Sequence, residues 1–404
     1  MTPVLLVLNA GSSSLKFQVF EAGAVPRLVF RGLYEGLGGA ARFAARSAEG
    51  SVLGEASWGA GEAVGHEQAL IHLVDWLRSN KGSLKLSAVG HRVVHGGEAH
   101  AGPALVDDAV LAQLDKLVAL APLHQPHNLK PIRIVRRELP ELPQVACFDT
   151  AFHRSQPEIA QIFALPREMR QRGVRRYGFH GLSYDYIASV MGEYDARLCE
   201  GRVIVAHLGN GASLCAMKAG VSVATTMGFS ALEGLPMGTR CGAVDPGVIF
   251  YMLREMRLTP EEAERTLYTK SGLLGVSGVS NDMRQLRASA STNADAQLAI
   301  DLFVYRITRE IGSLISALGG LDALIFTAGI GENDVATRAE VVEGLRWAGF
   351  ALDHEANGRG GPLITSGEES AAWVIPTNEE LVIARQVQGV LSGRSAPARN
   401  MEVA

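Results

Sequence analysis

No apolar run in this sequence of 404 residues approaches the ~20 residues that a membrane-spanning helix needs. The first apolar stretch, Val4 to Leu8, is shorter than the ~7–15 residues of a signal-peptide core, and no Lys or Arg precedes it. We therefore expect neither a membrane partner nor a signal peptide.

The sequence is also poor in cysteine and has no excess of basic charge. Its four cysteines, Cys147, Cys199, Cys215 and Cys241, form no C-x-x-C pair, so we expect no disulfide framework and a cytoplasmic location. Lys and Arg number 38 against 42 Asp and Glu, for a formal net charge of −4. A nucleic-acid-binding chain normally carries a basic excess, so no nucleic-acid partner is expected. With 47% hydrophobic residues, the chain can form two or three globular domains.

Short apolar strands alternate with helical patterns, which indicates an α/β fold. The spacing of apolar residues and the positions of turn residues predict strands over 4–8, 15–20, 28–33, 88–94, 144–148, 203–207, 324–327 and 373–375. The same signals predict helices over 66–78, 109–120, 129–138 and 295–318. Thr377-Asn378-Glu379-Glu380 fits a capping box that opens a final helix. The residues after Ser392 are typical of a frayed tail.

One motif recurs at half the chain length. A shift of about 199 residues places the strand 203–207 over the strand 4–8, and Asn210-Gly211-Ala212-Ser213-Leu214 over Gly11-Ser12-Ser13-Ser14-Leu15. Two unrelated hairpins would also produce this match. A duplicated domain explains the offset better, and it is the hypothesis that we carry forward.

Three small-residue loops, at residues 9–14, 209–213 and 328–331, each follow an apolar strand. Such loops expose backbone N–H groups to phosphate oxygens, and Lys16 could add a positive charge. The sequence contains neither G-x-x-x-x-G-K-[ST] nor G-x-G-x-x-G, so a P-loop and a Rossmann fingerprint are not supported. A nucleotide phosphate site of another kind is therefore predicted.

Charged residues stand beside these loops. Arg92 lies inside an apolar strand, where a guanidinium needs an anion, and His180 and Arg240 stand in glycine-flanked loops. Asp149 and Glu379 follow short strands, where carboxylates could hold Mg²⁺. Each alone is more often structural, but together they suit phosphoryl transfer.

At this point the sequence resembles the acetate kinase family. The motifs that carry the resemblance run in family order over nearly the whole chain: residues 9–16 (NAGSSSLK), 90–97 (GHRVVHGG), 148–153 (FDTAFH), 177–181 (YGFHG), 207–213 (HLGNGAS), 237–240 (MGTR) and 377–380 (TNEE). The resemblance implies two duplicated actin-like (ribonuclease H-like) domains that enclose a nucleotide cleft. It implies residues 1–150 plus 384–404 for the first domain, and residues 151–383 for the second, with nucleotide binding and dimerisation. A homodimer, with Mg²⁺ as cofactor (or Mn²⁺ as a substitute), is implied too.

The resemblance also assigns roles by position. Arg92, Asp149, His180 and Arg240 match catalytic residues, with His180 and Arg240 stabilising the transition state. Asn9 and Glu379 match metal-site positions, and Asn9 also helps to position the phosphoryl group. The substrate would contact Arg92, Val94, Leu123, Phe179 and Ala231. The nucleotide would contact Ser14, Lys16, His207, Leu208, Gly209, Asn210, Gly211, Asp282, Met283, Arg284, Gly329, Ile330, Gly331, Glu332 and Asn333. The implied reaction interconverts ATP and acetate with ADP and acetyl phosphate.

Three positions depart from the family pattern. Ala231 replaces a proline that would wall the substrate pocket, Gln125 replaces an asparagine, and Ala243 replaces an acidic residue. A kinase that prefers propionate or butyrate, a sugar kinase of the same fold and an actin- or chaperone-like ATPase switch therefore stay open as alternatives. Arg92, His180 and Arg240 count against the switch, because a simple ATPase needs no anion clamp.

Overall fold

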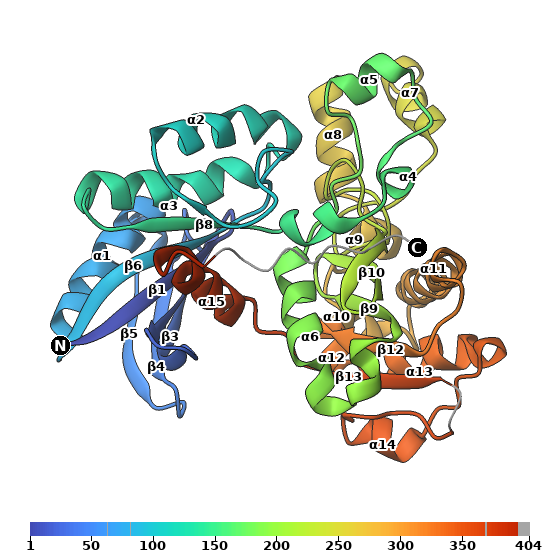
Figure 1. The fold of residues 1–404 in the computed structure, drawn as a ribbon. Helices are drawn as coiled ribbons and strands as arrows, with labels where there is room; N and C mark the ends of the chain where they lie inside the picture. The colour runs from blue at the N-terminus through green and yellow to red at the C-terminus, as the bar shows by residue number, and fades with distance from the viewer. Residues whose placement is uncertain (63, 81, 368–369, 395–404) are drawn as a thin grey trace. The chain divides into compact units, whose positions relative to one another are not determined.

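The computed structural model describes residues 1–394 except 63, 81, 368 and 369, and these residues form two compact units (Figure 1). Of the described residues, unit 1 comprises Met1–Phe152 together with residues 378–394, and unit 2 comprises His153–Thr377. The predicted domain boundaries stay a prediction. The predicted frayed tail falls mostly on residues outside the described part.

Unit 1 is an α/β unit around one sheet in the order β5-β4-β3-β2-β1-β6-β8-β7. Its strands are β1 (Thr2–Ala10), β2 (Ser14–Glu21), β3 (Arg27–Glu35), β4 (Arg42–Ser47), β5 (Val52–Ser57), β6 (Leu84–Val93), β7 (Ala104–Leu105) and β8 (Gln144–Phe148). Its α-helices are α1 (His66–Asn80), α2 (Asp108–Lys116), α3 (Gln125–Glu138) and α15 (Glu379–Leu391). Strands β1, β6 and β8 are parallel, so their carboxyl ends meet at one edge of the sheet.

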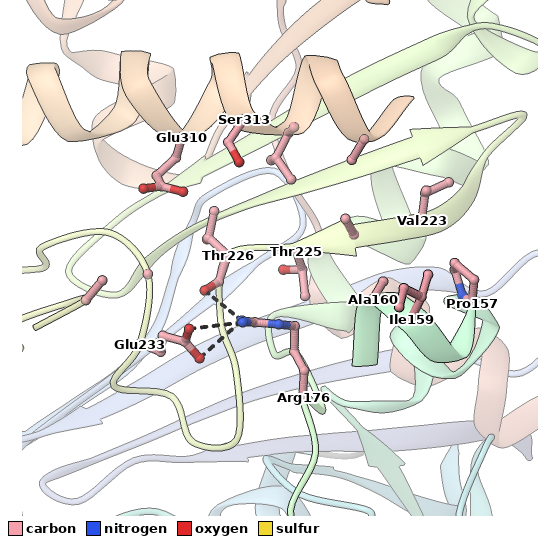
Figure 2. Close-up of a pocket in the computed structure, with 15 residues that line it drawn as sticks. Pro157, Ile159, Ala160, Arg176, Val223, Thr225, Thr226, Glu233, Glu310 and Ser313 are labelled. Carbon is pink, nitrogen blue, oxygen red and sulfur yellow. Dashed lines mark hydrogen bonds and ion pairs between the residues drawn. The ribbon is translucent and has the colours of Figure 1, made fainter. Parts of the chain in front are cut away.

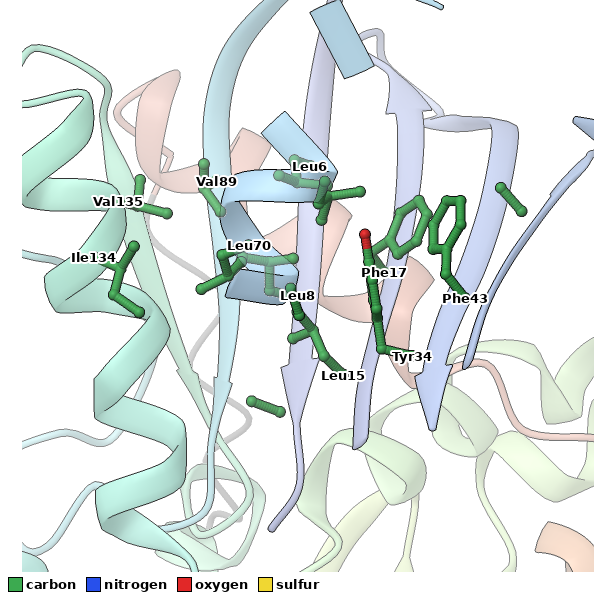
Figure 3. Packing of buried hydrophobic residues seen from close by; sticks show 14 of the residues in the cluster. Leu6, Leu8, Leu15, Phe17, Tyr34, Phe43, Leu70, Val89, Ile134 and Val135 are labelled. Carbon is green, nitrogen blue, oxygen red and sulfur yellow. The ribbon is translucent and has the colours of Figure 1, made fainter. Parts of the chain in front are cut away.

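Apolar side chains on one face of this sheet pack under α1 and α3 (Figure 3). The rings of Phe17 and Phe43 stack with their centroids 6.1 Å apart, and Tyr34 lies 4.8 Å from Phe43. Val89 of β6 packs into the same cluster with Val135 of α3. Burial of each large apolar side chain contributes about 1.5–3 kcal/mol to the stability of the unit. This packing holds in place the strands that carry the site.

Helix α15 covers the other face of this sheet. A Cβ on Gly90, the neighbour of Val89, would lie 2.6 Å from Cγ2 of both Ile383 and Val387. Because successive strand residues point to opposite faces, α15 and the cluster around Val89 lie on opposite sides. Glycine at position 90 allows the close approach of α15, which begins at Glu379.

The predicted capping box at the start of this helix is wrong. Asn378 is the N-cap, and its Oδ1 accepts a hydrogen bond from the backbone N–H of Leu381 at 3.0 Å. Glu380 instead faces Asn9. Asparagine is as good an N-cap as threonine, and here it leaves both glutamates free to face the site.

Unit 2 repeats the central topology. Its sheet has the order β11-β10-β9-β12-β13. Strands β9, β10 and β11 pair antiparallel, as β1, β2 and β3 do in unit 1. Strands β9, β12 and β13 pair in parallel, as β1, β6 and β8 do in unit 1. The strands are β9 (Arg202–Leu208), β10 (Ala212–Lys218), β11 (Val221–Thr225), β12 (Ala323–Thr327) and β13 (Ala371–Val374). The helices are α4 (Glu158–Gln161), α5 (Arg167–Gln171), α6 (Gly181–Tyr194), α7 (Pro246–Arg254), α8 (Pro260–Thr269), α9 (Gly272–Ser277), α10 (Met283–Ser289), α11 (Ala294–Leu318), α12 (Ala328–Asn333), α13 (Val335–Gly344) and α14 (His354–Gly358).

The two hairpins differ in length. Leu8 pairs with Phe17, whereas His207, its match in the 199-residue shift, pairs with Ser213. The shift of 199 residues therefore matches β1 with β9. The returning strands β2 and β10 match at a shift of 196 residues, which places Ser213 over Phe17. The loop at 328–331 is a second correction, because these residues begin the short helix α12.

Two further observations bear on the sequence predictions. The α/β fold class is confirmed. Within the described ranges, no helix is long and apolar enough to cross a membrane.

Candidate functional site

Arg92 is the centre of a charged cluster in unit 1. It lies in β6, and Asp149 directly follows the neighbouring parallel strand β8. Its Nε donates to Asp149 Oδ1 at 3.1 Å and its Nη2 donates to Oδ2 at 2.7 Å, while Glu379 Oε2 lies 3.9 Å from Nε. Asp149 is 2% exposed, so this two-pronged ion pair is shielded from water and holds the guanidinium in one orientation.

The same cluster changes the pKa values of its members. Burial raises the pKa of Glu379 to about 7; the charge of Arg92 opposes this rise, and the charge of Asp149 adds to it. Burial lowers the pKa of Arg92, but the charges of Asp149 and Glu379 outweigh it, so the net pKa is raised. Arg92 therefore stays a cation, whereas burial favours the neutral form of Glu379 more than water does.

The predicted metal-site residues meet in this cluster. Asn9 Oδ1 accepts from Arg92 Nη1 at 3.4 Å, and Asn9 Nδ2 donates to Glu380 Oε1 at 3.4 Å. Over the described residues, no group of three or more His, Cys, Asp and Glu side chains is arranged to hold a metal ion. Mg²⁺ commonly keeps several waters and takes one or two carboxylates together with substrate phosphates. Asp149 and Glu379 fit an ion held in that way.

The other predicted residues of unit 1 lie around this cluster. Ser14 begins β2, and the exposed Lys16 is close enough for its charge to lower the pKa of Glu379 against the effect of burial. Val94 follows β6 and is buried, but Leu123 is 41% exposed. Their shared pocket stays a prediction.

In unit 2, two imidazoles stack at the end of β9. His180 caps α6 in the left-handed conformation with a φ of 58°, and its ring lies 4.2 Å from the ring of His207. The Nδ1 atom of His180 lies 2.8 Å from Ser213 Oγ, and that of His207 lies 2.9 Å from Ser183 Oγ. These hydroxyl contacts hold each imidazole ring in a defined orientation at the end of β9.

Arg240 is brought to the same hairpin. A Cβ on Gly211 would lie 2.5 Å from Arg240 Nη2 and 3.1 Å from His180 Nε2, so a side chain at position 211 would displace these groups from the turn. Arg240 Nη1 donates to the carbonyl of Ala231 at 2.6 Å. Phe179 is buried beside His180. The predicted catalytic and substrate residues of unit 2 are therefore gathered around one glycine turn.

Two further segments join this edge of the unit 2 sheet. Asn281 Nδ2 donates to Asn210 Oδ1 at 3.2 Å, which brings the segment Asp282–Arg284 to the turn. Asp282 caps α10 and pairs with the Arg284 guanidinium at 2.6 Å. Strand β12 pairs with β9 as far as Thr327 with His207, so α12 starts at the same edge. The predicted nucleotide residues 207–211, 282–284 and 329–333 thus converge within unit 2.

Unit 2 also contains a pocket of about 450 Å³ whose described lining includes none of these catalytic residues (Figure 2). In it, Arg176 forms a two-pronged ion pair with Glu233 at 3.0 and 3.1 Å and donates to the Thr226 carbonyl at 3.4 Å. Ala243 lines the same pocket. Nothing in the structure explains the replacement of an acidic residue by alanine at this position.

Four residues that support the site were missed by sequence reasoning. Ser213 and Ser183 engage the two histidines, Asn128 binds the ends of β1 and β6, and Arg338 donates to the carbonyls of Gly331 and Glu332 at 3.1 and 2.9 Å. Only Ser213 lay within a quoted motif. The others lie in helices, where no local pattern separates a polar residue that faces a site from one that faces water.

Comparison with known proteins gives one consistent result. The model of the acetokinase family matches residues 4–385. The acetate kinase of Rhodopseudomonas palustris is 50% identical over 97% of this chain and 100% of its own length, and that of Rhizobium meliloti is 46% identical over 97% and 99%. Among solved structures, a propionate kinase from Francisella tularensis has a TM-score of 0.89 at 36% identity and covers 96% of this chain and 99% of that one. The Porphyromonas gingivalis acetate kinase has a TM-score of 0.85 at 35% identity and covers 96% and 100%.

These matches span both units and therefore include every residue group described above. The resemblance stated from the motifs is confirmed, and so is the fold class. The chain belongs to the acetokinase family and is an enzyme, a kinase that uses ATP and has a carboxyl group as phosphoryl acceptor.

Proposed function

We propose that this enzyme catalyses the reversible, Mg²⁺-dependent transfer of the γ-phosphoryl group of ATP to acetate, giving acetyl phosphate and ADP. The observation that supports this proposal most is the approach of Arg240 and His180 to the glycine turn at Gly211. A fixed cation and a ring nitrogen at a glycine turn suit a phosphoryl group, which needs charge neutralisation more than covalent chemistry.

In the proposed mechanism, a carboxylate oxygen of acetate attacks the γ-phosphorus in line. The new O–P bond forms as the bond to the bridging oxygen breaks, and ADP leaves with that electron pair. The attacking carboxylate is already ionised at pH 7, so no general base is required. Arg92 and Arg240 would hold the anionic groups, and His180 would donate from Nε2 to the transferring group.

Asp149, Glu379 and Asn9 would hold the metal ion. When bound, Mg²⁺ supplies charge neutralisation at the phosphate oxygens. The residues 207–211, 282–284 and 329–333 would bind the nucleotide, with Ser14 and Lys16 contributing from unit 1.

The test is ADP formation from MgATP with acetate, propionate, butyrate, glucose or no addition in parallel. We expect acetate to give the highest kcat/KM and the blank to be nearly silent. Equal ADP formation without any acid would favour the ATPase switch, and formation that depends on glucose would favour a sugar kinase.

Propionate is the second candidate acceptor for two reasons. The chain is similar to a propionate kinase, and Ala231 stands where the family pattern has proline. A proline ring at this position would narrow the pocket, although a single methylene changes discrimination by only ~1–3 kcal/mol. Replacement Ala231→Pro should lower the rate on propionate and butyrate relative to acetate. Unchanged relative rates would refute the role of this position.

We also propose that the enzyme is a homodimer in the cytoplasm. In helix α7 of unit 2, the apolar side chains of Val248, Phe250 and Tyr251 are 42%, 52% and 58% exposed. Exposed apolar side chains grouped on one element are typical of a protein–protein interface. None of the four cysteines, which all lie in the described part of the chain, forms a disulfide bond, and this is compatible with the reducing cytoplasm.

A further inference from the structure

The side-chain amide of Asn128 bridges two strands of unit 1 at the point where their pairing stops. Strands β1 and β6 pair in parallel as far as Leu8 with His91. Beyond that pair, Asn128 Nδ2 donates to the carbonyl of Ala10 at 2.8 Å, and Asn128 Oδ1 accepts from the N–H of Val94 at 2.9 Å. An amide offers one acceptor and a donor, as a peptide group does, so it links the two strand ends where they no longer bond to one another.

The link is buried and rigid. Asn128 is 4% exposed and lies in the first turn of α3. Three residues earlier, at the start of α3, the fully buried Gln125 accepts from the N–H of His95 at 3.2 Å and donates to its carbonyl at 3.0 Å. Helix α3 therefore holds the chain just after β6 at two consecutive residues.

The two backbone groups that Asn128 binds stand beside residues of the proposed site. Ala10 follows Asn9, and Val94 lies two residues after Arg92. The Asn9 and Arg92 side chains meet at 3.4 Å. A change in the distance between the two strand ends would therefore move the Arg92 guanidinium and the Val94 side chain relative to Asn9.

We propose that Asn128 is a positioning residue for the carboxylic acid substrate. It acts through Arg92 and Val94, the residues of unit 1 that are expected to hold the carboxylate and the alkyl group. The inference rests on the proposed function and deepens it, because it names a residue in α3 that sets the geometry of the acid site. The three main nucleotide segments, 207–211, 282–284 and 329–333, belong to unit 2, so we expect them to depend on this amide less than the acid site does.

Two variants separate the contacts of the amide. Asn128→Asp keeps the shape and the acceptor for the Val94 N–H but places a second acceptor against the Ala10 carbonyl. Asn128→Leu removes both hydrogen bonds. The matched control is Gln144→Leu, since Gln144 is also 4% exposed and its amide lies 2.8 Å from His91 Nε2, at the amino end of β8 and away from Asp149.

For each variant, kcat, the KM for acetate and the KM for ATP are measured, together with the melting temperature and circular dichroism. We expect kcat/KM for acetate to fall by about tenfold to a hundredfold in both Asn128 variants, because small displacements of reacting groups have effects of that size. The KM for ATP should stay within about threefold of the original value. The control should lose thermal stability without a selective effect on acetate.

The outcomes separate the hypotheses. A folded Asn128 variant with an unchanged kcat/KM for acetate overturns the inference, as does an equal change in the KM for ATP or the same profile in Gln144→Leu. If Asn128→Leu does not fold, Asn128→Asp decides, and failure of both to fold makes the residue structural and also overturns it. If the unsubstituted enzyme shows no acid-dependent ADP formation, the proposed function fails instead.

Discussion

Arg240 is held by the Ala231 carbonyl and by its close approach to Gly211, so its guanidinium is fixed before substrate binds. Removal of a preorganised cation of this kind from a phosphoryl-transfer site lowers turnover by about 10³–10⁵-fold. We expect Arg240→Ala to reduce kcat by this order with an unchanged circular dichroism spectrum. Arg240→Lys should recover only part of it, because lysine keeps the charge but not the planar fork.

The control for this measurement is Arg197→Ala, whose side chain is 82% exposed in the same unit. Its turnover should equal that of the unsubstituted enzyme. Near-normal turnover of Arg240→Ala would remove that residue from the proposed mechanism.

Buried histidines predict how stability depends on pH. Burial lowers the pKa of His91 to about 4, and that of His95 likewise, from an ordinary value near 6.5. Between these values the unfolded chain binds more protons than the folded one, so the free energy of unfolding falls as the pH falls. Each such histidine contributes about 1.4 kcal/mol per pH unit in this window.

The variant His91→Gln isolates one of these protons. Urea unfolding between pH 6.5 and 4 should show a slope that is smaller than in the unsubstituted protein by about 1.4 kcal/mol per pH unit. Equal slopes in His91→Gln and the unsubstituted protein would show that His91 is not protonated on unfolding in this range.

Among the elements, those with strong local patterns could be predicted from the sequence. The strand over 144–148 and the long helix ending before Gly319 are found as predicted, since an apolar run and a glycine C-cap are local signals. The strands β4 and β5 are not predicted from the sequence, because they contain few large apolar residues. The glycines of α12 predict a turn at residues 328–331, whereas the structure has a short helix there. Glu332, which accepts from the Ala328 N–H at 2.8 Å, and Arg338 stabilise it through contacts that the sequence does not reveal.

Helix α15 places Glu379 in its first turn, so the end of this element affects the site. Asn378→Ala removes the hydrogen bond to Leu381 and should lower the free energy of unfolding by about 1 kcal/mol. Asn378→Asp keeps an acceptor and should be nearly as stable as the unsubstituted protein. Thermal and urea unfolding of the two variants test this, and equal stability of both would show that another group caps α15.

At the scale of the molecule, the motif order pointed to the family, and the 199-residue shift pointed to duplication. The shared strand order of the two sheets agrees with that duplication, because a repeated pattern of strands follows from a repeated sequence of apolar runs. The residues that gather in each unit's own cluster could also be predicted from glycine turns and isolated charges. The supports of the site, such as Asn128, could not, since their partners are backbone groups far away in the sequence.

The surface of α7 makes a prediction about assembly. Phe250 is 52% exposed on a helix in which Met252 is buried, and a dimer interface on this helix would cover it. The unsubstituted protein should then have a mass in solution of about twice 43.0 kDa by light scattering. Phe250→Glu would bury a charge in such an interface and should shift the protein towards the monomer. Leu105→Glu, at a site in unit 1 that is also 52% exposed, should leave the mass unchanged. A dimer that withstands Phe250→Glu would place the interface on another surface, and a monomeric unsubstituted protein would refute the homodimer itself.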